Sequence, residues 1–250
     1  MTIAPLKSWL ICIDDTDDIG TKGTGEIAEE IASLLCEHKD PRCWVTRHQL
    51  FVHPDIPYTS HNSAMCFQLQ SRASLAEIKQ VAVSHLLQQS APASDPGLAI
   101  IALDSEFDIQ ALIEFGLATK KEVKTKEQAY ELAEQLGVAL SEHGGTGQGV
   151  IGALAGLGLR LYGHDGRVKG QINLGQEECE EGIEISVADL LDRTGLDMVI
   201  NLEKEVLEPS EILHLSKKVK AIYCRHQFAL LVYQHEQRWC NALKKHLKAY

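Results

Sequence analysis

Residues 9–25 read WLICIDDTDDIGTKGTG, an apolar run that ends in four aspartates and continues into three glycines and two further threonines. The five residues 9–13 are typical of a short buried strand. From Glu26 onward the apolar residues recur at helical spacing, which predicts a helix entered through the glycine-rich loop. The stretch therefore predicts a strand, an acidic glycine-rich loop and a helix in succession.

Four carboxylates in this loop predict a cation and a phosphate at the same place. Carboxylates at the end of a buried strand repel one another unless a cation lies among them, and their hard oxygens suit Mg²⁺. The predicted magnesium ligands are Asp14, Asp15 and Asp17. Glycines let the backbone approach a ligand closely, and the next helix offers unpaired N–H groups to phosphate. The predicted phosphate-binding residues of this loop are Gly20, Thr21, Gly23 and Gly25.

Two other interpretations of the acidic loop stay open. The aspartates can form a solvated loop and helix cap, which is the commoner role of short polar stretches. A phosphatase-type DxD motif would use Asp15 as nucleophile and Asp17 as acid. The spacing disfavours the second alternative, because Gly20 and Thr21 come later than a DxDGT pattern places them.

A second glycine-rich stretch, residues 143–158, reads HGGTGQGVIGALAGLG and contains a GxGxxG pattern. A dinucleotide fingerprint follows a strand, whereas residues 125–142 have helical spacing, so a Rossmann interpretation is rejected. Glycines at the start of a helix can still form an anion site. The alternative, given equal weight, is that these glycines allow close packing of the helix. The predicted phosphate-binding residues here are Gly145, Thr146, Gly147 and Gly149.

A polar loop between two predicted strands, 43–52 and 64–70, favours a substrate rim. The predicted substrate-contacting residues are Arg47, Tyr58, His61 and Asn62. The next predicted elements are a helix over 74–89, with Ser74 and Glu77 as a capping box, a strand over 98–103 and a helix over 105–116. This order suits a ferredoxin-like unit.

The predicted fold class is mixed α+β, with a kinase-like catalytic domain and a ferredoxin-like unit. The expected divisions are a catalytic domain from 1–42 and 117–195, a ferredoxin-like unit over 43–116, and a small α/β extension over 196–250. A hairpin is predicted over 159–174, closing on the turn Asp165–Gly166. Helices are predicted over 209–219 and 235–250.

Composition limits the class of protein. Hydrophobic residues make up 44% of the 250 and charged residues 24%, and no apolar run is long enough to span a bilayer. The N-terminal apolar stretch lacks a basic start and a cleavage site, so a cytoplasmic protein is expected. The formal net charge of −11 argues against broad, nonspecific binding of nucleic acid. The seven cysteines contain no CxxC, which indicates neither a disulfide framework nor a zinc ribbon.

Three motifs in this order resemble the catalytic half of the archaeal tRNA-isoleucine agmatidine (2-agmatinylcytidine) synthetases. They are IDDTDDIGTKGTG, RHQLFVHPDIPYTSHNSA and HGGTGQGVIGALAGLG, and the resemblance covers roughly residues 8–175. That family joins agmatine to a tRNA cytidine using ATP. The resemblance implies a ferredoxin-like domain, metal binding by Asp14, Asp15 and Asp17, and a phosphorylated threonine, for which Thr24 matches best and Thr21 stays an alternative.

The family also carries an OB-fold and a zinc ribbon that hold the tRNA. This chain has no CxxC pair and a different tail, so neither an OB-fold nor a zinc ribbon is expected. The tRNA-handling part of the family is thus expected to be missing from this sequence.

The leading functional prediction is a Mg²⁺- and ATP-dependent enzyme of phosphoryl or nucleotidyl transfer, either a ligase or a kinase-like transferase. The predicted catalytic residues are Asp15, Asp17 and Thr24. The expected acceptor is a small molecule, or a tRNA delivered by a separate RNA-binding partner. A nucleotide-binding regulatory module without turnover is the alternative from another class. An inactive descendant whose glycines serve only packing is the third.

Overall fold

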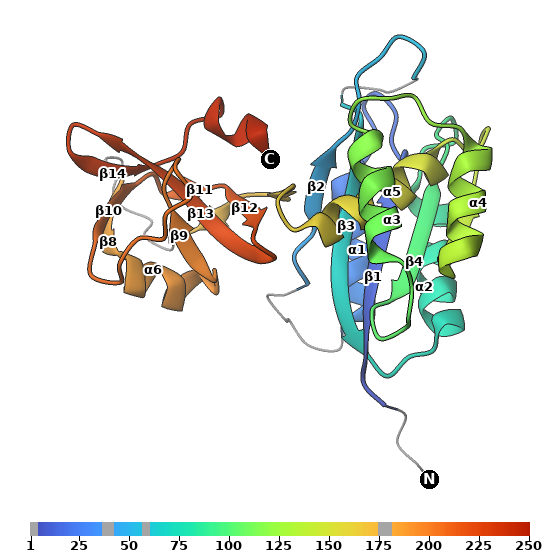
Figure 1. Cartoon of the computed structure of the whole chain (residues 1–250), viewed down its shortest axis with the longest axis horizontal. Coiled ribbons are helices and arrows are strands. Elements are labelled where there is room, and N and C mark those ends of the chain that lie inside the picture. The colour runs from blue at the N-terminus through green and yellow to red at the C-terminus, as the bar shows by residue number, and fades with distance from the viewer. Residues whose placement is uncertain (1–4, 37–42, 57–60, 175–181) are drawn as a thin grey trace. The chain divides into compact units, whose positions relative to one another are not determined.

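The computed structural model describes residues 5–36, 43–56, 61–174 and 182–250, and its contacts divide the chain into the units Met1–Tyr162 and Gly163–Tyr250 (Figure 1). The strands described in the first unit are β1 (Lys7–Asp14), β2 (Thr46–Gln49), β3 (Ser63–Ser71), β4 (Gly97–Ala102) and β5 (Ala139–Glu142). Its helices are α1 (Thr24–Leu35), α2 (Leu75–Gln89), α3 (Ile109–Ala118), α4 (Lys126–Leu136) and α5 (Gly149–Tyr162). The predicted mixed α/β class is confirmed.

Strand β1 lies in the middle of the first unit's sheet, which has the order β5-β4-β1-β3-β2 with every neighbouring pair antiparallel. Trp9, Ile11 and Ile13 face one hydrophobic core, while Leu10 and Cys12 face another. Side chains alternate between the two faces of a strand. The continuous apolar run therefore reflects a central strand that is buried on both sides.

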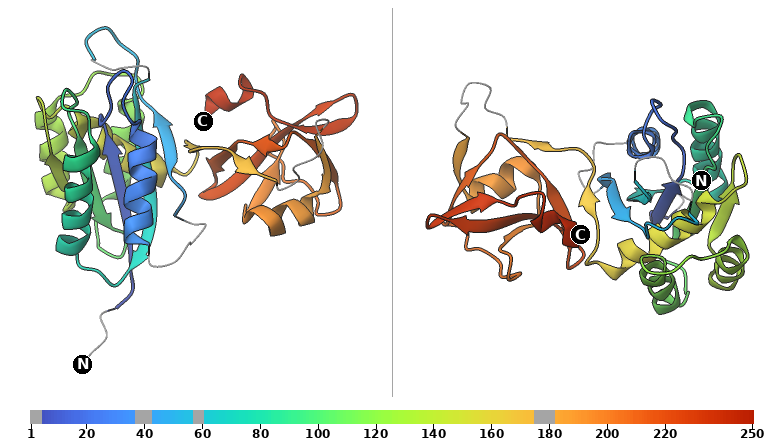
Figure 2. Two further views of the ribbon diagram at one scale, coloured as in Figure 1. Left: turned by 180° about the vertical axis from the view of Figure 1, so that it is seen from behind. Right: turned by 90° about the horizontal axis from the view of Figure 1, so that it is seen from above.

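Helices cover both faces of this sheet, so the first unit has three layers (Figure 2). Helices α1 and α2 pack on the face of Ile11, and α3, α4 and α5 pack on the face of Cys12. The predicted capping box at the start of α2 is confirmed: the Ser74 hydroxyl accepts from the Glu77 N–H, and the Glu77 carboxylate accepts from the Ser74 N–H. None of the described helices is long and apolar enough to cross a membrane.

Two glycines of α5 serve close packing, as one of the two interpretations of the second glycine-rich stretch predicted. A Cβ at Gly156 would lie 2.3 Å from Cys12 Sγ. A Cβ at Gly158 would lie 2.0 Å from the carbonyl oxygen of Leu112 in α3. Helix α5 therefore approaches both the sheet and α3 at distances that only glycine allows.

The helix predicted over 125–142 was wrong in its last part. Helix α4 ends at Leu136, because Gly137 adopts a left-handed conformation with φ 69° and closes the helix end. The Val138 N–H then donates to the Ala133 carbonyl, which completes this closing motif. The chain continues as β5, which pairs antiparallel with β4.

The unit boundaries also differ from those expected. Residues 43–116 contribute β2, β3 and β4 to the same sheet as β1, because β1 pairs with both β3 and β4. The division by contacts falls after Tyr162, at the end of α5. The strands expected to form a ferredoxin-like unit are thus built around the strand that carries the acidic loop.

The second unit is mostly β-structure. Its strands are β6 (Arg167–Val168), β7 (Ile172–Asn173), β8 (Ile183–Ser186), β9 (Met198–Ile200), β10 (Ile212–Leu215), β11 (Lys218–Val219), β12 (Ala221–Cys224), β13 (Gln227–His235) and β14 (Arg238–Asn241). Its helices are α6 (Val187–Thr194) and the short 3₁₀ helix η2 (His246–Ala249). The main sheet has the order β6-β12-β13-β14-β10-β8, with β9 parallel to β13, and β7 pairs separately with β11.

Three predictions for this half of the chain were wrong. Residues 159–162 continue α5 instead of forming a hairpin strand, and Arg167 pairs with Ile222 of β12. The segment predicted as a helix over 209–219 forms β10 and β11. The segment 235–250 forms β14 and η2, because its first half returns along β13 as a hairpin partner. Strand pairing overrides the local helical spacing in both segments.

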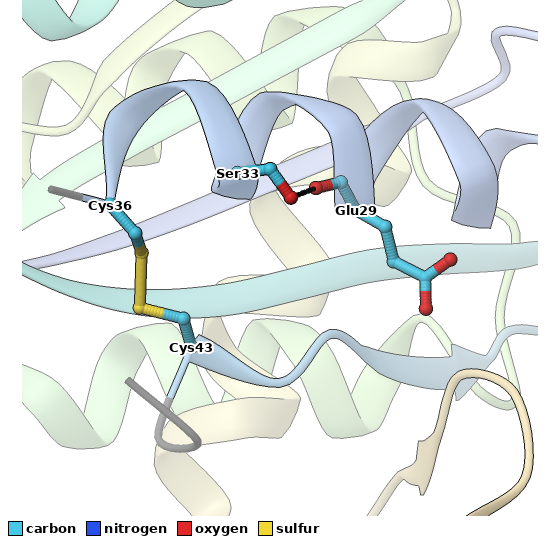
Figure 3. The surroundings of a disulfide bond; sticks show 4 residues. All are labelled: Glu29, Ser33, Cys36 and Cys43. Carbon is cyan, nitrogen blue, oxygen red and sulfur yellow. Dashed lines mark hydrogen bonds between the residues drawn. A yellow bond between two sulfur atoms is a disulfide. The ribbon is translucent and has the colours of Figure 1, made fainter. Parts of the chain in front are cut away.

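A disulfide joins Cys36, at the C-terminal end of α1, to Cys43, just ahead of β2, contrary to the prediction from cysteine spacing (Figure 3). Of the other cysteines in the described residues, Cys12, Cys66 and Cys224 are buried thiols and Cys240 is half-buried. Disulfides are typical of oxidising compartments. The cytoplasmic location, which was expected from the N-terminal stretch, stays a prediction.

We predict that Gly158→Ala destabilises the protein by about 2 kcal/mol, because the new methyl group meets the backbone of α3 and cannot be accommodated by a side-chain shift. Urea unfolding of the purified variant measures the change. The matched control is Gly23→Ala, where a Cβ has no heavy atom within 4 Å. An equal loss in both variants would contradict the packing argument.

Candidate functional site

The two glycine-rich loops meet at one edge of the first unit's sheet. In the strand register Asp14 lies opposite Gly97, and Gly97 lies opposite Glu142. The end of β1, the start of β4 and the end of β5 therefore share this edge. The acidic loop leaves the end of β1, the segment before β4 leads into its start, and the second glycine-rich loop leaves the end of β5. These three segments therefore lie at the same edge of the sheet, although they are far apart in the sequence.

Asp14 is buried at the end of β1, beside the first turn of α5. Its exposed fraction is 8%, and a Cβ at Gly152 would lie 1.6 Å from its Oδ2 atom. Burial raises the pKa of Asp14 well above its usual value, and the charge of Asp15 raises it further. Gly149 is also required here, because a Cβ at this position would lie 2.2 Å from the backbone oxygen of Asp95.

Asp15 adopts a left-handed backbone conformation with φ 55°. Burial raises the pKa of Asp15 to about 6, and the charges of Asp95 and Asp17 contribute to the rise. Aspartate and asparagine tolerate this backbone region better than most residues. The chain therefore turns sharply at Asp15 and holds its carboxylate close to other negative charges.

Thr24, the first residue of α1, bridges the acidic loop. Its hydroxyl donates to Asp17 Oδ1 at 2.9 Å and accepts from the Thr16 N–H at 3.4 Å. Thr24 is 6% exposed, whereas Thr21 is exposed and pairs locally with the backbone of Asp18. Of the two threonines considered, only Thr24 therefore has a carboxylate in contact with its hydroxyl.

Asp95 is the site residue that sequence reasoning missed. Its carboxylate accepts from the Thr146 N–H at 2.7 Å, from the Thr146 hydroxyl and from the Gln148 N–H at 3.4 Å. Burial alone would raise the pKa of Asp95, but these hydrogen bonds, the one from the Thr146 hydroxyl foremost, lower it. Asp95 lies in the segment SAPASDPG, which reads as an ordinary loop, and no local signal marks it.

Asp95 thus connects the two predicted phosphate loops. Its charge acts on Asp15, while its side chain caps the second glycine-rich loop. Gly145 leaves room for this contact, because a Cβ there would lie 1.6 Å from Asp95 Oδ1. The N–H group of Thr146, which was predicted to bind phosphate, and that of the neighbouring Gln148 point to a carboxylate in this conformation.

Lys126 holds the other side of the second loop. Its ammonium group donates to the Thr146 carbonyl at 2.7 Å and pairs with Glu142. Gly147, with φ 76°, lies under this pair, since a Cβ there would lie 1.4 Å from the Glu142 carboxylate. The remaining loop glycines, Gly20, Gly23 and Gly25, belong to the acidic loop and the start of α1, and Gly20 has φ 83°.

The predicted substrate residues lie in and after β2, and their described side chains are engaged there. Arg47 donates from Nε to the Ser63 hydroxyl at 2.9 Å, and Asn62 donates to the Phe51 carbonyl at 2.6 Å. His61 is exposed, and Tyr58 lies outside the described residues. The loop that joins β2 to β3 starts beside the acidic site, because Leu50 packs against the position of Gly152.

The carboxylates fit Mg²⁺ only in combination with a phosphate ligand. In the described part of the chain, no group of three or more His, Cys, Asp or Glu side chains is arranged to hold a metal ion. Asp14, Asp15 and Asp17 are therefore not a closed ligand set. Mg²⁺ typically binds one or two protein carboxylates and completes its shell with substrate phosphates and water. The mutual repulsion of Asp14 and Asp15 suits this incomplete arrangement.

The fold is similar to that of solved tRNA-modifying enzymes. The crystal structure of a complex of TiaS with tRNA and ATP matches with a TM-score of 0.51 and 21% identity, covering 61% of this chain and 36% of that chain. A tRNA fluorescent labeling enzyme matches with a TM-score of 0.47 and 22% identity, over 60% of this chain and 36% of that one. Apo TiaS, a tRNA agmatidine synthetase, matches with a TM-score of 0.45 and 21% identity, over 60% and 35%.

The first of these similarities shows the fold. The chain spans about a third of the length of the structures that it matches. No protein family model and no curated protein matches the sequence.

We predict that Asp15→Asn stabilises the metal-free protein at neutral pH. Because the folded pKa of Asp15 is raised to about 6, its stabilising contribution is complete below the unfolded value near 4 and is lost as the pH rises through 6. Asparagine removes this loss, which is on the order of 2 kcal/mol, and tolerates the same backbone conformation.

Thermal unfolding in a chelating buffer between pH 4 and pH 8 measures the difference. The two proteins should unfold at similar temperatures at pH 4, and the variant should unfold at the higher temperature at pH 7. A constant difference across this range would contradict the assignment of a raised pKa to Asp15.

Proposed function

We propose that this protein is a Mg²⁺-dependent, ATP-using enzyme that transfers a phosphoryl or nucleotidyl group. The observation that carries the proposal is the meeting of the acidic loop, the Thr24–Asp17 pair and the second glycine-rich loop at one edge of the sheet. The fold similarity to an ATP-bound tRNA-modifying enzyme supports it. The acceptor belongs to one of two classes, a small molecule or an RNA.

Asp14 and Asp15 would hold Mg²⁺ in this proposal, and the bound ion would neutralise the charge of the ATP phosphates. Catalysis by the chain itself would then consist of positioning and of proton transfer. The buried edge of the sheet keeps water away from Asp14, and the first turn of α5 packs against this carboxylate near the positive end of the helix dipole. The two glycine-rich loops would hold the phosphates on either side of Asp15.

The Thr24–Asp17 contact suggests a first acceptor. In a transfer to Thr24, its hydroxyl oxygen forms a bond to the γ-phosphorus of ATP, and the bond between that phosphorus and the bridging oxygen breaks. ADP leaves, and the hydroxyl proton passes to Asp17, whose carboxylate already accepts a hydrogen bond from it at 2.9 Å. Thr24 at the start of α1 would then carry a phosphate where the helix dipole favours an anion.

We predict that the purified protein converts ATP to ADP or AMP in the presence of Mg²⁺, and that Asp15→Asn lowers this rate by about 100-fold or more. Chromatography of ATP labelled at the α or the γ phosphate identifies the bond that breaks. Asp18→Asn is the matched control, because Asp18 is exposed and pairs only within its own loop. If ATP binds but stays intact with RNA and small amines present, the regulatory-module alternative replaces the enzyme.

The same incubation tests the threonine. Intact mass spectrometry should show a phosphate adduct that is absent in Thr24→Val and present in Thr21→Val. An adduct lost only in Thr21→Val would mean that the exposed Thr21, and not Thr24, is the phosphorylated residue.

We also predict that Asp95→Asn raises the affinity for ATP by about tenfold. In the structure the Asp95 carboxylate occupies the N–H groups of Thr146 and Gln148, so an incoming phosphate must displace it and tolerate its charge. Asparagine keeps the shape and removes the charge. Titration of a fluorescent ATP analogue measures the affinity, with Asp104→Asn, remote at the other end of β1, as the charge-matched control. A weaker affinity in Asp95→Asn would mean that Asp95 only supports the loop.

A further inference from the structure

The negative charge of this chain is concentrated in its first 215 residues. Residues 216–250 contain eight Lys and Arg and a single Glu, although the whole chain has a net charge of −11. The last 35 residues thus carry a net +7, and the first 215 carry −18. The average charge hides a basic segment, which lies entirely in the second unit.

The fold of this segment separates its apolar residues from its lysines. Leu247 and Tyr250 pack into the core of the second unit with residues of β9, β12 and β13. Lys244, Lys245 and Lys248 are exposed on the same short stretch. Three lysines therefore project from the outer side of a segment whose other side is fixed to the sheet.

The turn between β12 and β13 adds more cations nearby. Arg225 and His226 have φ values of 55° and 59° at the two central positions of this tight turn, and both are exposed. The Arg225 guanidinium donates to the backbone carbonyl of Lys204 at 2.7 Å. Tyr250, at the end of the lysine stretch, reaches the same place, since its hydroxyl contacts Cys224 Sγ at 4.0 Å.

Positive charges are crowded at this turn. Burial lowers the pKa of His164, and the neighbouring charges of Lys204, His226 and Arg225 lower it further. Glu203 and Glu205 flank Lys204 in the sequence. The Glu205 carboxylate accepts from the side-chain amide of Asn201, and the Glu205 N–H donates to Asn201 Oδ1. We call the exposed residues Lys204, Arg225, His226, Lys244, Lys245 and Lys248 the basic surface.

Aromatic rings lie beside the lysine stretch, since His246 falls between Lys245 and Lys248. The rings of Tyr233 and His246 are 5.0 Å apart, and those of Tyr233 and His235 are 6.2 Å apart. His235 is exposed, and Tyr233 and His246 are half-buried. Single-stranded or looped RNA is bound where cations contact its phosphates and aromatic rings stack on its bases.

We propose that the second unit binds RNA along the basic surface. This inference rests on the proposed function, for which it selects RNA over a small molecule as the acceptor class. The rings of Tyr233, His235 and His246 beside the lysines select RNA over a membrane surface, since bases stack on such rings. Leu202 and Val206, on either side of Lys204, and Leu243 are exposed, so binding to lipid vesicles is measured alongside RNA binding.

The experiment measures binding of the full chain to a tRNA transcript and to a short single-stranded RNA by fluorescence polarisation at several salt concentrations. The test variant changes Lys244, Lys245 and Lys248 to Gln. The control variant changes Lys7, Arg72 and Lys121 to Gln, since these three are exposed in the first unit and the change in net charge is the same. Binding of ATP to each protein is measured in parallel.

The original protein should bind RNA. The test variant should bind about tenfold more weakly, and its slope of log affinity against log salt should be smaller by about 2 to 3, one ion-releasing contact for each lysine. The control variant should bind as the original protein does. ATP binding should be unchanged in both variants.

Absence of RNA binding, or an equal loss in the test and control variants, would overturn the inference. Binding to phosphatidylserine vesicles in place of RNA would also overturn it. If ATP is cleaved and RNA is not bound, this inference fails and the proposed function stands. If RNA is bound and ATP is neither bound nor cleaved, the proposed function fails and the RNA surface stands.

Discussion

The burial of Asp14 at the end of a central strand is the constraint on which the rest of the site depends. An ionised carboxylate in an apolar interior is costly unless dipoles or opposite charges compensate it. Here the first turn of α5 lies directly against the carboxylate, and only glycine at position 152 allows that approach. In the free protein burial still raises the pKa of Asp14 well above its usual value, so the ionised form needs a bound cation in addition to the helix N-terminus. The place of α5, and with it that of the second glycine-rich loop, follows from this contact.

Asp95 shows how a site can be held by a contact that no local pattern reveals. Its partners Thr146 and Gln148 lie 51 and 53 residues away in the sequence, and they meet Asp95 only because β4 and β5 pair at the edge of the sheet. The loop N–H groups need an acceptor whether or not a ligand is present. In the proposed function, a carboxylate that fills this role in the free protein would also set the affinity of a phosphate that replaces it.

Local signals in the sequence were sufficient for the elements that local physics decides. The strand 9–13, the helix that starts at Thr24 and the capping box of Ser74 each depend on neighbours within a few residues. The failures have the opposite cause. Residues 139–142 and 212–215 form strands because distant partners pair with them. The disulfide of Cys36 joins two segments whose proximity no local sequence pattern predicts. The Rossmann interpretation was rejected because a helix was expected directly before the second glycine-rich loop, whereas the structure has the strand β5 there. The rejection still holds, because β5 is antiparallel to β4 and a dinucleotide-binding fold needs parallel strands.

Because charge is unevenly distributed along the chain, the net charge of the whole chain does not predict which partners each surface attracts. A polyanion is repelled by a surface according to the charges within about 10 Å of it, not by the sum over the whole chain. The acidic loop can therefore repel nucleic acid while the lysines beside η2 attract it. Mg²⁺ at the carboxylates would remove the local repulsion only where a phosphate completes its coordination. In the proposed function such a chain would admit polyphosphate to the acidic edge through the metal, and it would meet a longer polyanion through the basic surface.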